Sequence, residues 1–188
     1  TSLEIVPVSR MEEVLKVVNP KLINASEIQN PTEAQANVIR ACAELNHDVC
    51  MALYFATERI DGLNDELLVR DWLNVVEPLL TLLGEAAPPR ATYYLIKLMA
   101  LFTPVAPEKA FDLMSFSLIN GGQRFGYQYE SMGTDLVVEQ IGILLADDKQ
   151  IFGNEARRQK LIETLELFME AGWPSARRLL YRLPELIQ

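Results

Sequence analysis

Apolar residues recur at steps of three and four along most of this chain, in runs separated by glycine, proline and asparagine. That spacing places the apolar side chains on one face of an α-helix. No segment of the sequence alternates apolar and polar residues with turns at hairpin spacing, the pattern typical of paired strands. The sequence therefore predicts an all-α fold.

Helix-start and helix-stop signals divide the chain into segments. Ser9 and Glu12 have the spacing of a capping box, and the helix that they open is expected to end at Asn19-Pro20. Residues 30–33 predict the next start, with Asn30 as the cap and Pro31 at the first helical position. That helix either continues to Gly62 or breaks near residues 46–48, and residues 64–66 open another. Further helices are predicted over 67–84, 92–102, 108–119, 134–146 and 155–171, with breaks at 86–89, 103–107 and 120–122.

The turn at residues 172–175 leads into a last helix, which Pro184 interrupts or ends. The 92–102 helix is apolar nearly all round, so we expect it in the middle of the fold.

Each helix with its connection takes roughly 20 to 25 residues, so consecutive pairs span about 40 to 47, as in two-helix repeats. The expected pairs are 72–84 with 92–102, 108–119 with 134–146, and 155–171 with the last helix. The segment Val75-Val76-Glu77-Pro78-Leu79-Leu80 resembles the proline-kinked first helix of a HEAT unit, and the array resembles HEAT and armadillo repeats. This resemblance implies a right-handed α-α superhelix of antiparallel helix pairs over residues 61–188, following N-terminal helices in 1–60, within one domain. An irregular helical bundle is the alternative.

Composition excludes several classes of function. The 188 residues carry 26 acidic against 17 basic side chains, a net charge of -9, which argues against nucleic-acid binding. No apolar run approaches the roughly 18 residues of a membrane span, so we expect no membrane partner and a soluble, cytoplasmic chain. The first residue is Thr1 and the last is Gln188, from which we expect a fragment of a larger protein.

The sequence offers few candidates for a catalytic, metal-binding or phosphate-binding site. Cys42, His47 and Cys50 could approach one another on a continuous helix, but they lack the short spacing of structural zinc ligands. No third group orients a cysteine-histidine pair. The glycine-rich stretch 121–126 lacks the lysine and hydroxyl of a phosphate-binding loop and is expected to be a helix C-cap followed by a loop. We therefore predict a chain that is not an enzyme and takes no metal or cofactor.

The segment 124–133 is the first candidate binding site. Arg124, Tyr127, Tyr129 and Glu130 combine rigid aromatic rings with both charges, and such residues form binding hot spots. The alternative is packing, in which Phe125 and the tyrosine rings wedge between helices while Arg124 pairs with Glu130.

The second candidate is a basic face near the carboxyl end. Residues 155–188 hold six basic against five acidic side chains, whereas residues 1–154 hold eleven against twenty-one. Arg178 and Arg182 are four apart and would share a helical face that could receive an acidic partner or a phosphate. The alternative is a solvated face, or one docked on an acidic helix.

A second resemblance involves the carboxyl-terminal half. The residues that carry it are Tyr127-Gln128-Tyr129-Glu130-Ser131, Asp135-Leu136-Val137-Val138, Ala171-Gly172-Trp173-Pro174 and Ala176-Arg177-Arg178-Leu179. Together they are similar to the carboxyl-terminal helical region of large bacterial multidomain ATP-binding proteins. The resemblance implies a sensor, scaffold or regulatory part, with the enzyme upstream.

Three functions follow as hypotheses. The first is a non-catalytic interaction, scaffold or regulatory module that binds a protein partner or other domains of its own chain. The second is a helical domain that binds a small molecule or peptide in an interhelical pocket lined by Arg124, Tyr127, Tyr129 and Glu130, as part of an enzyme. The third is a homo-oligomer that pairs through apolar residues of the last helix, Leu179, Leu180, Leu183, Leu186 and Ile187.

Overall fold

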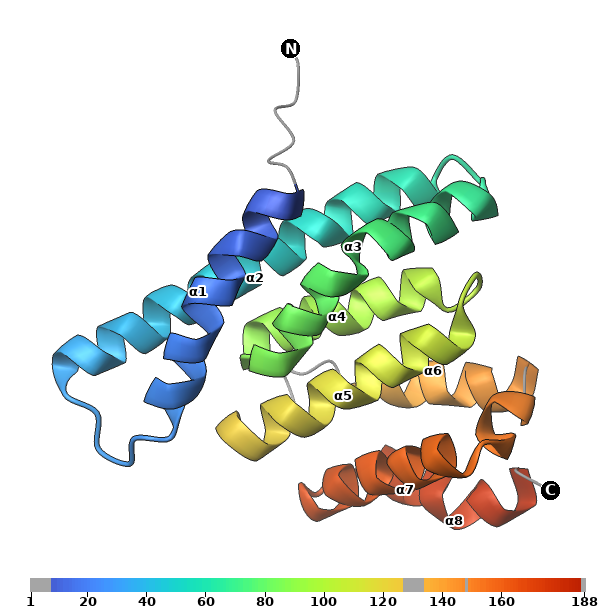
Figure 1. Cartoon of the computed structure of the whole chain (residues 1–188). Coiled ribbons are helices and arrows are strands. Elements are labelled where there is room, and N and C mark those ends of the chain that lie inside the picture. The colour runs from blue at the N-terminus through green and yellow to red at the C-terminus, as the bar shows by residue number, and fades with distance from the viewer. Residues whose placement is uncertain (1–7, 127–133, 148, 187–188) are drawn as a thin grey trace.

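The computed structural model describes residues 8–126, 134–147 and 149–186, all of which belong to helices or the connections between them (Figure 1). These residues contain no strand, so the all-α prediction is confirmed. The elements are α1 (Val8–Ser26), α2 (Glu33–Asp61), α3 (Glu66–Ala86), α4 (Pro89–Phe102), α5 (Pro107–Phe125), α6 (Thr134–Asp147), the short 3-10 helix η1 (Lys149–Gly153), α7 (Glu155–Glu170) and α8 (Pro174–Leu186).

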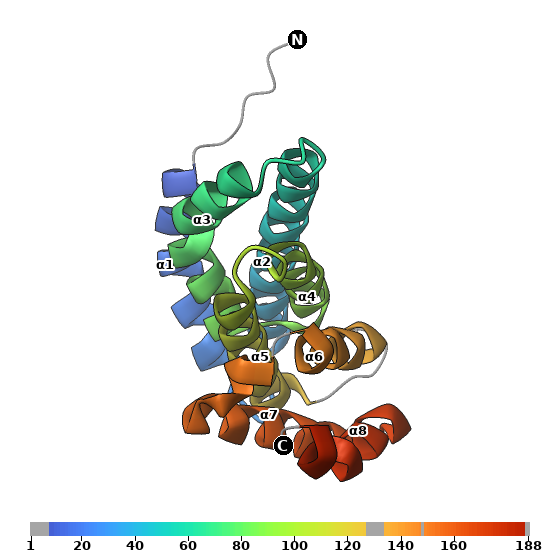
Figure 2. The same ribbon diagram turned by 90° about the vertical axis from the view of Figure 1, so that its right-hand side faces the viewer.

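The helices pack in two rows, which Figure 2 shows side by side. In one row α1 contacts α3, α3 contacts α5, and α5 contacts α7. In the other α2 contacts α4, α4 contacts α6, and α6 contacts α8. Of the expected pairs, α3 with α4 and α7 with α8 are in contact, but α6 packs on α8, η1 and α4 instead of on α5.

Capping residues explain where the helices begin. The hydroxyl of Thr32 accepts a hydrogen bond from the Gln35 amide at 3.3 Å, and the Gln35 side chain accepts one from the Thr32 amide at 2.8 Å. This capping box starts α2 at Glu33, so the predicted cap at Asn30 was wrong by two residues. Asp65 caps α3 as the 64–66 signal predicted, because its carboxylate accepts from the Leu68 amide at 3.1 Å.

Three predicted breaks lie inside helices, and so do residues 46–48, where a break was one of two alternatives. α1 continues through Pro20 to Ser26, α2 runs unbroken through residues 46–48, and α8 includes Pro184. α5 continues through residues 120–122 to Phe125. At Gly121 an added Cβ would lie 2.7 Å from the Ala87 carbonyl oxygen, so this glycine permits close packing and does not end the helix.

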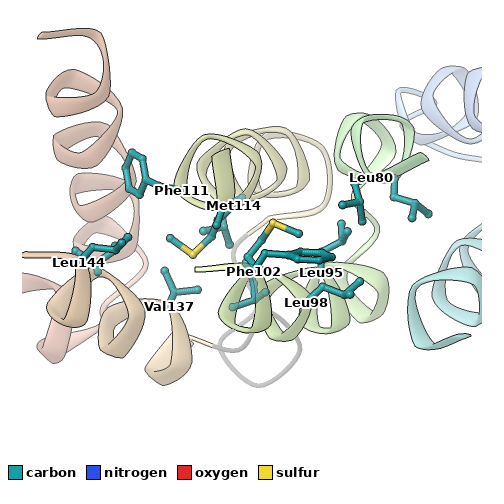
Figure 3. Packing of buried hydrophobic residues seen from close by; sticks show 14 of the residues in the cluster. Leu80, Leu95, Leu98, Phe102, Phe111, Met114, Val137 and Leu144 are labelled. Carbon is teal, nitrogen blue, oxygen red and sulfur yellow. The ribbon is translucent and has the colours of Figure 1, made fainter. Parts of the chain in front are cut away.

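One buried hydrophobic cluster extends from Leu15 in α1 to Leu183 in α8. Figure 3 shows its centre, where Leu80 of α3, Leu95 and Phe102 of α4, and Met114 of α5 meet. The α4 helix lies in the middle of the fold as predicted, because it contacts α2, α3, α5 and α6. Among the described helices, none is long and apolar enough to cross a membrane.

Candidate interaction surfaces

The direction of α8 is set by the turn that precedes it. The Gly172 amide donates to the Met169 carbonyl at 3.0 Å, and the Trp173 amide donates to the Phe168 carbonyl at 3.0 Å. Gly172 has φ +89°, which completes a Schellman motif. The rings of Trp173 and Phe168 pack with centroids 4.2 Å apart, the apolar contact that accompanies this motif. The turn predicted at residues 172–175 is therefore confirmed.

With that direction, α8 turns its leucines inward and its arginines outward. Leu183 is buried, and the half-buried Leu179 and Leu180 pack against the main core. These leucines therefore do not form the exposed apolar face that self-association through them would need. The side chain of Leu186 and all of Ile187 lie outside the described residues.

The outward side of α8 carries the arginine face, which we define as Arg177, Arg178, Tyr181 and Arg182. All four residues are exposed, and Tyr181 is 70% exposed. The Arg177 guanidinium lies 5.6 Å from the centroid of the Tyr181 ring, within cation–π range. No carboxylate among the described residues forms an ion pair with any of these arginines. The structure thus places the predicted Arg178 and Arg182 together in an exposed basic surface.

A hollow of about 400 Å³ adjoins the arginine face at the turn between α7 and α8. It is lined by Met169, Gly172, Trp173, Pro174, Arg177 and Tyr181. An incoming side chain would therefore meet apolar surface beside the arginines.

Arg124 plays a packing role at the end of α5. Its guanidinium donates a hydrogen bond to the Glu85 carbonyl in the last turn of α3, where a cation is favourable because helix carbonyls are unpaired. Phe125 packs against a small cluster of Leu22, Cys42 and Ala86. Tyr127, Tyr129 and Glu130, with the proposed contact to Arg124, lie outside the described residues.

A second hollow, of about 430 Å³, lies along α3, α5 and α7. Its charges are largely paired: Lys109 lies 2.7 Å from Glu77, and Arg157 binds Asp112 at 3.2 Å and Glu108 at 2.9 Å. The hydrogen bond with Asp112 raises the pKa of Arg157. These pairs join the three helices, so we assign them to packing. The lining residues are Glu77, Thr81, Glu108, Lys109, Asp112, Leu113, Phe116, Arg157 and Lys160.

An aromatic surface between α2 and α4 was not predicted from the sequence. The Lys97 ammonium lies 4.4 Å from the centroid of the Tyr54 ring, 5.6 Å from Tyr93 and 5.9 Å from Tyr94. The His47 ring meets the edge of Tyr94, with centroids 5.4 Å apart. The available signals were the four-residue step from Tyr93 to Lys97 and the seven-residue step from His47 to Tyr54. Neither signal showed that the two helices would be neighbours.

Both cysteines lie in the interior of the protein. Cys42 and Cys50 are buried free thiols, and burial raises the pKa of each. His47 contacts Asp48, with 3.1 Å between Nδ1 and the carboxylate. Within the described ranges, no group of three or more histidine, cysteine, aspartate or glutamate residues is arranged to hold a metal ion.

No family model, curated protein or solved structure matches this chain. The described residues form an all-α domain. No relative supports the resemblance to HEAT and armadillo repeats or the resemblance to bacterial ATP-binding proteins.

Proposed function

We propose that this chain is a non-catalytic interaction module of the HEAT or armadillo type, with α1/α2, α3/α4, α5/α6 and α7/α8 as its successive units. The two rows of helices support this assignment, because in such arrays equivalent helices of adjacent units contact one another. The pair α5/α6 departs from the pattern, because α6 packs on α4, η1 and α8.

We further propose that the arginine face of α8 receives an acidic segment of a protein partner. The observation that carries this proposal is the exposure of three arginines and Tyr181 in a chain of net charge -9, with no acidic partner among the described residues. Arginine and tyrosine dominate the energetic centres of protein interfaces. Guanidinium groups also bind carboxylates in bidentate geometry.

The first test uses a fluorescein-labelled peptide of alternating glutamate and alanine with one central phenylalanine. Its fluorescence anisotropy is titrated with the chain at low ionic strength, because exposed charge interactions are screened by salt. We expect weak binding that falls at least fivefold in the double variant Arg178→Glu/Arg182→Glu.

The matched control reverses two other exposed arginines, Arg10→Glu and Arg40→Glu, in α1 and α2. The net charge changes equally in both double variants, so only a local surface can separate them. Equal losses in both would contradict the arginine face as the binding site. The hypothesis of an interhelical ligand pocket predicts instead that neither double variant matters.

A further inference from the structure

The aromatic surface on α2 and α4 has the composition of a binding cage for a cation. We define the tyrosine cage as Tyr54, Tyr93 and Tyr94, the three rings around Lys97. All three ring centroids lie within about 6 Å of the Lys97 ammonium, the range of favourable cation–π attraction. The molecule thus already holds one cation on these ring faces.

The charges at the edge of the cage favour a cation as well. The Tyr54 hydroxyl donates a hydrogen bond to the Glu58 carboxylate at 3.0 Å, which makes the Tyr54 ring richer in electrons. Asp48 is 67% exposed beside His47. No carboxylate among the described residues forms an ion pair with Lys97, and its ammonium lies over the tyrosine rings.

The cage is open to a partner at its edge. Tyr93 is 36% exposed and the neighbouring Phe55 is 47% exposed, so apolar surface continues outward from the rings. Lys97 is half-buried and reaches the cage on a flexible four-carbon stem. That stem can swing into solvent without moving either helix.

We propose that the tyrosine cage binds a lysine or arginine side chain from a basic segment of a protein partner, and that Lys97 occupies the cage while the partner is absent. Lys97 then lowers the apparent affinity, because the partner's cation must replace it. This site is separate from the arginine face, since α8 packs on α6 and α7, and it selects the opposite charge.

The test measures binding of a fluorescein-labelled peptide of alternating lysine and alanine, with the glutamate-alanine peptide as its counterpart. Replacing the internal occupant by Lys97→Ala or Lys97→Gln is expected to tighten binding of the basic peptide about three- to tenfold. Lys160→Ala is the matched control, because it removes one positive charge from α7, away from the cage. It should change the affinity by less than twofold.

A second substitution shows whether the gain depends on the rings. Adding Tyr93→Ala to Lys97→Ala should abolish the gain, whereas adding Phe116→Ala, at an aromatic residue of α5 that is likewise 36% exposed, should leave it. Circular dichroism checks that each variant keeps its helices.

Three outcomes would overturn the proposal. One is an equal effect of Lys97→Ala and Lys160→Ala, which would assign the gain to net charge. Another is a gain that survives the loss of Tyr93. The last is binding of the acidic peptide that Lys97→Ala removes and Arg178→Glu/Arg182→Glu leaves, because Lys97 would then recognise anions.

Discussion

The side-chain amide of Asn46 in α2 donates a hydrogen bond to the amide oxygen of Asn19 in α1, 2.9 Å away in the protein interior. Asn19 in turn donates to the Leu82 carbonyl of α3 at 2.7 Å, so the pair joins three helices. Both asparagines are at most 1% exposed. Two adjacent buried amides favour one relative position of α1, α2 and α3, because a shift of any of these helices would break buried hydrogen bonds.

Loss of this link is expected to destabilise the chain. Asn19→Ala removes both hydrogen bonds and should lower the free energy of unfolding by about 2 kcal/mol. Urea denaturation followed by circular dichroism measures it. Asn24→Ala, an exposed position of the same helix, should change it by less than about 0.5 kcal/mol. Similar losses at the two positions would refute the structural role of the buried pair.

Two helical glycines should respond to alanine with opposite signs. Gly121→Ala places a Cβ 2.7 Å from the Ala87 carbonyl oxygen, so we expect a loss of about 1–3 kcal/mol despite alanine's better helix propensity. Gly142 in α6 has no atom within 4 Å of the added Cβ, and Gly142→Ala should stabilise by about 0.5–1 kcal/mol. Thermal denaturation of both variants measures the two changes in stability. A stabilised Gly121→Ala would show that the close approach of α5 to the α3–α4 turn is wrong.

The ion pairs of Arg157 should contribute more than those of its neighbour. Arg157 joins α7 to α5 and its side chain is 19% exposed, whereas Arg158 pairs with Glu155 on the surface of its own helix. Arg157→Gln should therefore cost about 1–2 kcal/mol in unfolding free energy, and Arg158→Gln less than about 0.5 kcal/mol. Urea denaturation at low and high salt measures the unfolding free energies of the two variants. Equal costs would mean that the link from α5 to α7 is solvated.

The buried thiols predict a loss of stability in alkali. Burial raises the pKa of Cys50 above its ordinary value of 9.0, so in the folded chain the thiol keeps its proton while the unfolded chain loses it. A raised folded pKa contributes stability that is present below the unfolded pKa and lost above it. The free energy of unfolding should fall by about 1.4 kcal/mol per pH unit above pH 9 on account of this thiol. Cys50→Ala should remove that part of the slope between pH 9 and 10.5, and an unchanged slope would contradict the burial of Cys50.

Local signals in the sequence predicted the elements whose ends are fixed by neighbouring residues. Asp65 caps α3 and the Gly172 turn opens α8 through bonds that span at most five residues, so sequence spacing was sufficient. Pro20 and Gly121 were misread as breaks because tertiary packing holds their helices together across these positions. At residues 46–48, where both a break and a continuous helix were expected as alternatives, the helix is continuous. A proline, asparagine or glycine in the sequence does not show whether such distant contacts will form.

The same distinction explains the candidate sites. Arg178 and Arg182 share a face because they are one helical turn apart, and this spacing can be read from the sequence. The tyrosine cage joins Tyr54 of α2 to Lys97 of α4, and their proximity depends on how two helices pack. Arg124 is a candidate binding residue on the basis of its sequence neighbours, whereas its contact with the α3 carbonyl, 39 positions away in sequence, depends on how the helices pack.

The central claim is that the arginine face contacts a protein partner, and photocrosslinking in the cells that make the chain tests it most directly. A benzophenone amino acid replaces Tyr181 of α8 in one variant and Val17 of α1 in the other, both at least 60% exposed. We predict one discrete adduct from position 181, none from position 17, and loss of the adduct when Arg178→Glu and Arg182→Glu are added. The same adducts from both positions, or an adduct at 181 that the charge reversal leaves intact, would contradict the account.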